Sequence, residues 1–103
     1  MGAMKKKIVP PSHRARVFYT GRVQGVGFRY TAEQMALDAS LMGWVKNISD
    51  GRVELVCEGA KDAIDQYLAD LKSCHLGPFI KKVDVRWEPP TGEFIDFTVE
   101  FQL

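Results

Sequence analysis

The chain has 103 residues, of which 46% are hydrophobic and 26% charged, as expected for one globular domain with its own core. Lys and Arg number 14 against 13 Asp and Glu, which argues against a nucleic-acid binder that relies on a broad basic surface. No apolar run approaches the roughly 20 residues that span a bilayer, and no signal peptide is recognisable. We therefore expect a cytoplasmic protein without membrane contact, whose Cys57 and Cys74 are free thiols.

The first part of the chain predicts a strand, a loop and a helix. Residues 1–13 are polar and basic, and we expect a flexible lead-in that precedes one domain over residues 14–103. Alternation over residues 14–20 predicts a strand, and the glycine-rich residues 21–27 predict a loop. Residues 28–42 place their apolar side chains on one helical face. The side chains expected to face the core here are Ala15, Val17, Tyr19, Phe28, Ala32, Met35, Ala36 and Ala39.

The second part of the chain predicts a hairpin, a second helix and two further strands. Gly43 stands where a left-handed helix cap is expected. The remaining predicted elements are a strand at 44–47, a turn at 48–51, a strand at 52–58, a helix at 60–73, and strands at 80–88 and 95–101. Their side chains predicted to face inward are Val53, Leu55, Cys57, Ile64, Tyr67, Leu68, Leu71, Val83, Val85, Trp87, Ile95, Phe97, Val99 and Phe101.

This order of elements is β-α-β-β-α-β with one extra strand. It is the split β-α-β, or ferredoxin-like, pattern of an α+β sandwich. We therefore expect two helices on one face of a mostly antiparallel sheet of four to five strands. In this fold the first and third strands are adjacent, so the loop after the first strand and the end of the second strand face one another.

The glycine-rich loop is the strongest candidate for a binding site. Its glycines allow positive φ angles, and successive amide groups in such a loop converge on an anion. The helix that follows adds the positive end of its dipole. Arg29 in the first helical turn is unfavourable for the helix unless an anion is bound, and its planar fork suits phosphate or carboxylate oxygens. The alternative is a tight strand-to-helix turn; the loop has no nucleotide-binding motif of the Walker or Rossmann type.

Other candidate residues have simpler interpretations. Cys74-His75 could contribute to a metal site, but such a site needs three or four ligands and no partner motif is present, so we expect no metal and no cofactor. Asp50-Gly51 is typical of a hairpin turn. Trp44 and Trp87 are expected in the core, and His13 in solvent.

Two long motifs resemble those of one known family. Gly21-Arg22-Val23-Gln24-Gly25-Val26-Gly27-Phe28-Arg29 resembles the acylphosphatase signature Gly-x-Val-Gln-Gly-Val-x-Phe-Arg. Residues 43–54, GWVKNISDGRVE, resemble the second signature of the family, Gly-Trp-Val-x-Asn-x-x-Asp-Gly-x-Val-Glu. Gly59 and Gly77-Pro78 also fit. The resemblance covers about residues 14–101 and implies the fold that the pattern predicts.

The resemblance implies a hydrolase that cleaves the carboxyl-phosphate bond of acyl phosphates with neither a metal nor a covalent intermediate. By match to the motifs, Arg29 binds the phosphate and Asn47 orients the attacking water. The phosphate-binding backbone is then that of Gln24, Gly25, Val26, Gly27, Phe28 and Arg29. We expect a monomer whose partner is a small-molecule acyl phosphate.

Two alternative functions remain. One is a non-catalytic module that binds acyl phosphate or carbamoyl phosphate, as acylphosphatase-like domains occur in larger proteins. The other is an RNA-recognition module on the same fold, which needs exposed aromatic and basic side chains on the central strands. The third strand, RVELVCE, has no aromatic residue, so we expect no nucleic-acid partner.

Overall fold

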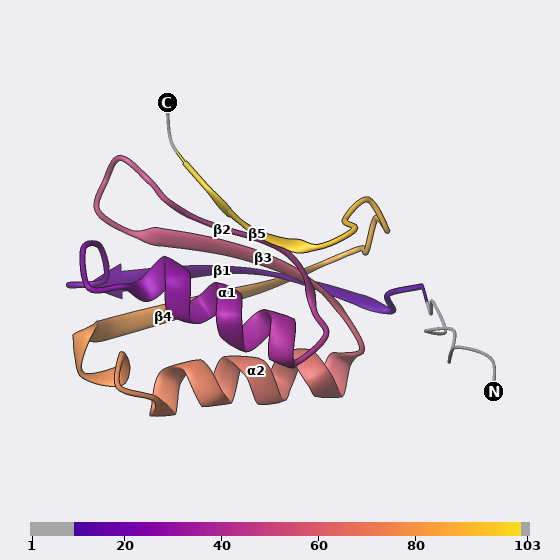
Figure 1. The fold of residues 1–103 in the computed structure, drawn as a ribbon, viewed down its shortest axis with the longest axis horizontal. Helices are drawn as coiled ribbons and strands as arrows, with labels where there is room; N and C mark the ends of the chain where they lie inside the picture. Colours follow the sequence, from indigo (N-terminus) through magenta and orange to yellow (C-terminus); the bar gives the residue numbers. More distant parts are fainter. Residues whose placement is uncertain (1–9, 102–103) are drawn as a thin grey trace, which may run out of the picture.

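The computed structural model describes residues 10–101, which fold into a sheet with two α-helices on one of its faces (Figure 1). None of the helices in this part of the chain is long and apolar enough to cross a membrane. The elements in chain order are β1 (His13–Gly21), α1 (Phe28–Asp38), β2 (Met42–Asn47), β3 (Val53–Gly59), α2 (Lys61–Ser73), the short 3-10 helix η1 (Gly77–Phe79), β4 (Ile80–Glu88) and β5 (Phe97–Glu100).

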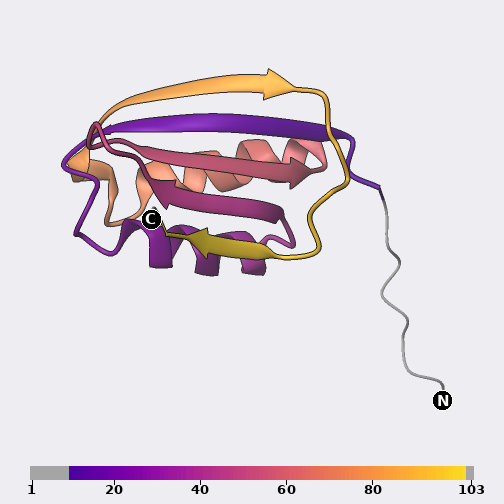
Figure 2. The same ribbon diagram turned by 90° about the horizontal axis from the view of Figure 1, so that it is seen from above.

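The five strands lie in the order β4-β1-β3-β2-β5 (Figure 2). All neighbouring pairs are antiparallel except β2 and β5, which are parallel. Both helices lie on the same side of this sheet in the two views, and the opposite face is open (Figures 1 and 2). The split β-α-β sandwich predicted from the sequence is thereby confirmed, with five strands.

The core lies between the helices and the sheet. Alternate side chains of the central strands fill it, as predicted. Ala15, Val17 and Tyr19 of β1 are buried, as are Val53, Leu55 and Cys57 of β3. The helices contribute the buried side chains Phe28, Ala32, Ala36, Ile64, Tyr67 and Leu71. Each large apolar side chain that is fully buried contributes roughly 1.5–3 kcal/mol to folding. The Tyr67 hydroxyl also donates a hydrogen bond of 2.8 Å to the carbonyl oxygen of Ala32, which joins the two helices.

The strand register brings the ends of β1 and β2 together. Val53, at the start of β3, pairs with Tyr19 near the end of β1 and with Asn47 at the end of β2. Because β3 is antiparallel to both neighbours, β1 and β2 run in the same direction and end at the same end of the sheet. Figure 2 shows the β1–α1 loop and the β2–β3 hairpin together at this end of the sheet. The expected approach of these two segments is confirmed.

The predicted end of the first helix was wrong. The helix ends at Asp38, and Ser40, with a φ of 57°, takes the left-handed conformation predicted for Gly43. Gly43 instead lies inside β2 with a φ of 145°. A Cβ atom there would lie 1.9 Å from the carbonyl oxygen of Val56 on the adjacent strand. Gly43 is therefore required by the close approach of β2 and β3, and not by a helix cap.

The outer strands differ from the sequence expectation. Trp87, predicted in the core, is 44% exposed, and Val85 is also exposed, because β4 is an edge strand and the helices pack mainly on the other strands. Ile95 and Phe101 fall outside β5 and are 95% and 70% exposed. The strand β1 begins at His13, the last residue of the predicted lead-in, and residues 10–12 belong to no helix or strand. The prediction for residues 1–9 lies outside the described residues.

Candidate active site

The loop after β1 is fixed at its first residues by close backbone packing. A Cβ atom on Gly21 would lie 2.2 Å from the carbonyl oxygen of Phe79, so only glycine fits there. The next amide, that of Arg22, donates a hydrogen bond of 2.9 Å to the same oxygen. Val23 is completely buried. These contacts hold the start of the loop against η1 and the core.

The second half of the loop is open and leads directly into α1. Gly25 and Gly27 have φ angles of 79° and 78°, and no atom lies within 4 Å of where a Cβ would stand at either residue. These glycines are therefore required for the backbone conformation, not for space. Phe28 is buried against Tyr19, with 4.8 Å between ring centroids, which anchors the first residue of the helix.

The start of α1 carries uncompensated positive charge. Gly27 is the N-cap, it provides no side-chain hydrogen bond, and the first turn contains no acidic residue. Arg29 is half-buried, and its guanidinium carbon lies 5.1 Å from the centroid of the Phe101 ring. The ion pairs found within residues 10–101 do not include Arg29. The helix dipole and an available guanidinium thus point to an anion at this end of the helix.

Arg29 and Asn47 line the same cleft, which has a volume of about 550 Å³. Gly25, Gly27 and Phe28 also line it, as predicted, whereas Gln24 and Val26 do not. Val26 packs against the core, and the side chain of Gln24 turns toward the β2–β3 hairpin. The complete lining is Val23, Gly25, Gly27, Phe28, Arg29, Tyr30, Glu33, Asn47, Thr98, Val99 and Phe101.

Sequence reasoning missed six residues of this cleft, of which Val23 lies in the loop itself. Tyr30 and Glu33 come from α1, and Thr98, Val99 and Phe101 come from β5 and the residue after it. Glu33 lies one turn after Arg29, and residues four apart share a helix face. This spacing could have predicted that Glu33 lies beside Arg29. The contribution of β5 follows from its parallel pairing with β2, for which the sequence offers no local sign.

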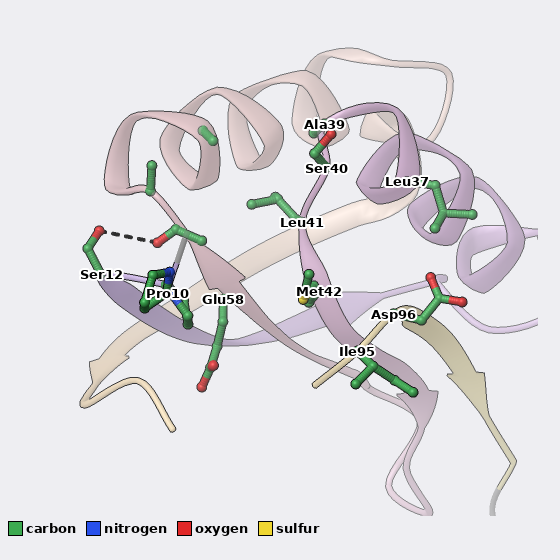
Figure 3. A pocket seen from close by; sticks show the side chains of 14 residues that line it. Pro10, Ser12, Leu37, Ala39, Ser40, Leu41, Met42, Glu58, Ile95 and Asp96 are labelled. Atoms are coloured by element: carbon green, nitrogen blue, oxygen red, sulfur yellow. Dashed lines mark hydrogen bonds between the residues drawn. The ribbon is translucent and has the colours of Figure 1, made fainter. Parts of the chain in front are cut away.

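A larger cleft of about 590 Å³ lies at the other end of the sheet (Figure 3). It is bounded by the end of α1, the start of β2 and the connection between β3 and α2, with Leu41, Met42 and Ile95 among its apolar walls. Its charged side chains, Glu58 and Asp96, are both acidic. The larger cleft therefore offers no cation to an anionic ligand, and the cleft at Arg29 is the better anion site.

Three carboxylates with lowered pKa values, Glu58, Glu88 and Glu93, belong to an ion network outside the cleft at Arg29. The pKa of a fourth, Asp50 in the β2–β3 hairpin, is lowered by hydrogen bonds from Arg52. Burial alone would raise the pKa of Glu58, but hydrogen bonds from Thr91, Arg14 and Gly92 lower it below its ordinary value. The pKa of Glu88 is lowered by Arg16 and Arg14. Within residues 10–101 no group of three or more His, Cys, Asp or Glu side chains is placed to hold a metal ion.

Comparison with known proteins gives the same family as the two sequence motifs. The family model described as Acylphosphatase matches residues 15–99. The chain belongs to the acylphosphatase family. An acylphosphatase of Roseiflexus sp. (strain RS-1) is 46% identical over 89 residues, which are 84% of this chain and 92% of that protein. An acylphosphatase of Trichormus variabilis is 48% identical over 77% of this chain and 78% of that protein.

Solved structures agree with this assignment. An acylphosphatase from Bacillus subtilis superposes with a TM-score of 0.77 at 32% identity and covers 85% of this chain and 98% of its own. Full-length HypF, in a phosphate- and nucleotide-bound form, superposes with a TM-score of 0.71 at 25% identity, but the match covers only 12% of that chain. The protein is therefore an acyl phosphate hydrolase with a ferredoxin-like fold, acting on a small-molecule acyl phosphate.

Proposed function

We propose that Arg29 and the loop amides hold the phosphoryl group of the substrate while Asn47 orients the water that attacks it. The observation that carries this proposal is the single cleft that Arg29, Asn47 and the open glycines Gly25 and Gly27 share. In this proposal the amides of residues 24–29 surround the phosphoryl oxygens at the positive end of α1. Each charge-assisted hydrogen bond of this kind contributes roughly 1.5–3 kcal/mol in a sheltered site.

The chemistry needs little more than positioning. An acyl phosphate is a mixed anhydride whose carboxylate is a good leaving group. The oxygen of water forms a bond to phosphorus, and the bond between phosphorus and the acyl oxygen breaks with its electron pair on the carboxylate. The proton of the water passes to a phosphoryl oxygen, so the products are a carboxylate and inorganic phosphate. Arg29 stabilises charge on the equatorial oxygens, and the cleft places the water in line.

Asn47 suits this task because a neutral amide both accepts and donates hydrogen bonds without taking a proton from water. The reaction then requires no general base, metal or covalent intermediate. The exposed rings of Tyr30 and Phe101 border the same cleft and provide an apolar surface for the acyl group.

The state of the protein in the cell is part of the same proposal. We propose a monomeric cytoplasmic enzyme whose domain spans residues 14–103. Cys57 and Cys74 are free thiols, which suits a reducing compartment. Burial raises the pKa of the Cys57 thiol to about 12, so this cysteine stays protonated and unreactive.

The alternative of a non-catalytic binding module is not favoured. The acylphosphatases compared above match over most of their own length at up to 48% identity, whereas HypF matches over 12% of its length at 25% identity. The residues proposed to bind phosphate and to orient water, Arg29 and Asn47, line the same cleft. A pure binding module would need only the first of these.

Hydrolysis of benzoyl phosphate in the presence of a chelator tests the proposal. We expect full activity without added metal, and incorporation of ¹⁸O from labelled water into phosphate and not into benzoate. Label in benzoate would mean that water attacks the acyl carbon, which contradicts the proposed role of the loop. Activity that disappears with the chelator and returns with a divalent cation would contradict the metal-free reaction.

A further inference from the structure

The side chain of Gln24 has no part in the proposed reaction, and it contacts the neighbouring hairpin. Its Nε2 atom lies 2.8 Å from the carbonyl oxygen of Ile48 and 2.9 Å from that of Arg52. Both partners are acceptors, so only the amide nitrogen can serve them, and each of its two hydrogens has a partner. The orientation of this amide is therefore fixed by chemistry.

The two carbonyl groups lie at the neck of the β2–β3 hairpin. The amide of Ile48 donates a hydrogen bond of 2.9 Å to the carbonyl oxygen of Arg52, which closes the neck. Asn47 directly precedes Ile48 and is the last residue of β2. Gln24 therefore binds the hairpin at the residue next to the one proposed to orient water.

This contact joins the two halves of the proposed site. Arg29 and the amides belong to the segment between β1 and α1, whereas Asn47 belongs to β2. Within residues 10–101, the hydrogen bonds between loop residues 22–27 and hairpin residues 47–52 are the two from Gln24. At its other side, the loop is bound to η1 through Arg22 and Phe79.

We infer that Gln24 is a positioning residue, which sets the distance between the phosphoryl group in the loop and the water at Asn47. The inference rests on the proposed function. In-line attack is sensitive to placement, and a shift of about 1 Å can lower the rate on the order of 100-fold. Removal of the Gln24 bridge leaves the phosphate-binding groups in the loop and frees the hairpin relative to them. Turnover should therefore suffer more than phosphate binding.

The test is a double-mutant cycle with Gln24→Met, Asn47→Ala and the double variant, assayed with benzoyl phosphate and with inorganic phosphate as inhibitor. Methionine keeps the length of the side chain and removes both donors. We expect Gln24→Met to lower kcat on the order of 10-fold, and the inhibition constant of phosphate to change less than about twofold. Asn47→Ala alone should lower kcat roughly 100-fold. In the Asn47→Ala background, Gln24→Met should have no further effect on kcat.

Gln66→Met is the matched control, because Gln66 on α2 also donates an exposed hydrogen bond of 2.8 Å, to Asp70. We expect wild-type kcat for this control. Gln24→Asn, which keeps the amide but is one methylene shorter, should lower kcat as Gln24→Met does, and thermal unfolding verifies that each variant is folded.

The cycle separates this inference from the function on which it rests. The positioning role would be overturned by an unchanged kcat in Gln24→Met. It would also be overturned if Gln24→Met lowered kcat by the same factor in wild type and in the Asn47→Ala background. In either case the proposed function stands. Full activity of Asn47→Ala would remove Asn47 from the proposed function, and the role of Gln24 with it.

Discussion

Arg29, which we propose binds the phosphoryl group, lies where a cation disfavours the helix that carries it. A cation in the first turn opposes the helix dipole, which favours acids there by roughly 0.3–1 kcal/mol. Its contact with the ring of Phe101 offsets part of this effect. If Arg29 binds phosphate as proposed, it shows the conflict between local stability and ligand binding that is common at functional sites.

We expect Arg29→Gln to abolish activity without unfolding the protein. Loss of the charged fork should lower kcat/KM for benzoyl phosphate at least roughly 100-fold and weaken inhibition by phosphate. The free energy of unfolding in urea should stay within about 0.5 kcal/mol of wild type, because the lost cation–π contact and the relieved dipole effect oppose each other. Arg22→Gln, which changes the same charge outside the cleft, is the control and should keep wild-type kinetics. Unchanged phosphate inhibition in Arg29→Gln would exclude Arg29 as the anchor.

Glu33 is an acid in the cleft that we propose binds an anion. It is half-buried on α1, and it forms no ion pair or side-chain hydrogen bond within residues 10–101. Its charge should disfavour acyl groups that carry a second negative charge. We expect Glu33→Gln to raise kcat/KM for succinyl phosphate about threefold to tenfold at low ionic strength and to leave that for benzoyl phosphate within about twofold. Asp38→Asn, the same change at the far end of α1, should alter neither value. An equal gain for both substrates would contradict selection by charge.

At the scale of elements, the sequence was informative where a pattern is local. Periodicity located both helices and the central strands, and the motif containing Asn47 placed this residue at a strand end. The sequence prediction failed where the position of a residue depends on strand pairing between distant segments. Trp87 alternates like a core residue, but it lies on an edge strand. Phe101 reached the cleft only because β5 pairs with β2 in parallel, which no local pattern of residues 95–101 encodes.

Gly43 illustrates the same limit and leads to a prediction. Its Cβ would collide with the carbonyl oxygen of Val56 at 1.9 Å, whereas Gly92, also at positive φ, has no atom within 4 Å of a Cβ. We expect Gly43→Ala to lower the free energy of unfolding by roughly 3 kcal/mol or more, since β2 must separate from β3. Gly92→Ala should cost only about 1–2 kcal/mol, the strain of the left-handed backbone. Urea titration measures both values, and equal losses would mean that strain alone explains Gly43.

At the scale of the whole molecule, one ion network holds the chain across the end of the sheet. β4 and β5 lie at opposite edges, and the segment between them crosses the ends of the intervening strands (Figure 2). Glu58 accepts hydrogen bonds of 2.8 and 2.9 Å from the amides of Thr91 and Gly92 in this segment. Arg14 lies opposite Glu58 and donates to it at 3.0 Å. The network thereby fastens the segment that delivers β5 to the cleft.

The stability of the molecule should depend on pH through Glu58. Its folded pKa is lowered, because the hydrogen bonds from Thr91, Arg14 and Gly92 outweigh burial, so its contribution is complete above the unfolded pKa of about 4.3. That contribution is lost as the pH falls through the lower folded pKa. We expect Glu58→Gln to cost about 2 kcal/mol in urea unfolding at pH 7, and the difference from wild type to shrink on acidification below about pH 4.

The neighbouring carboxylates Glu88 and Glu93 also pair with Arg14, and the pKa of each is lowered. Both are present in wild type and in Glu58→Gln, so the comparison reports the removal of Glu58 together with its coupling to them. Glu93→Gln is the control, and because its side chain is 56% exposed it should change stability little at any pH. A difference between wild type and Glu58→Gln that stays constant from pH 7 to pH 3 would show that Glu58 acts through shape and not through its charge. The position of β5 would then depend on the packing of the segment that leads to it. Any loss of stability in acid would come from other groups.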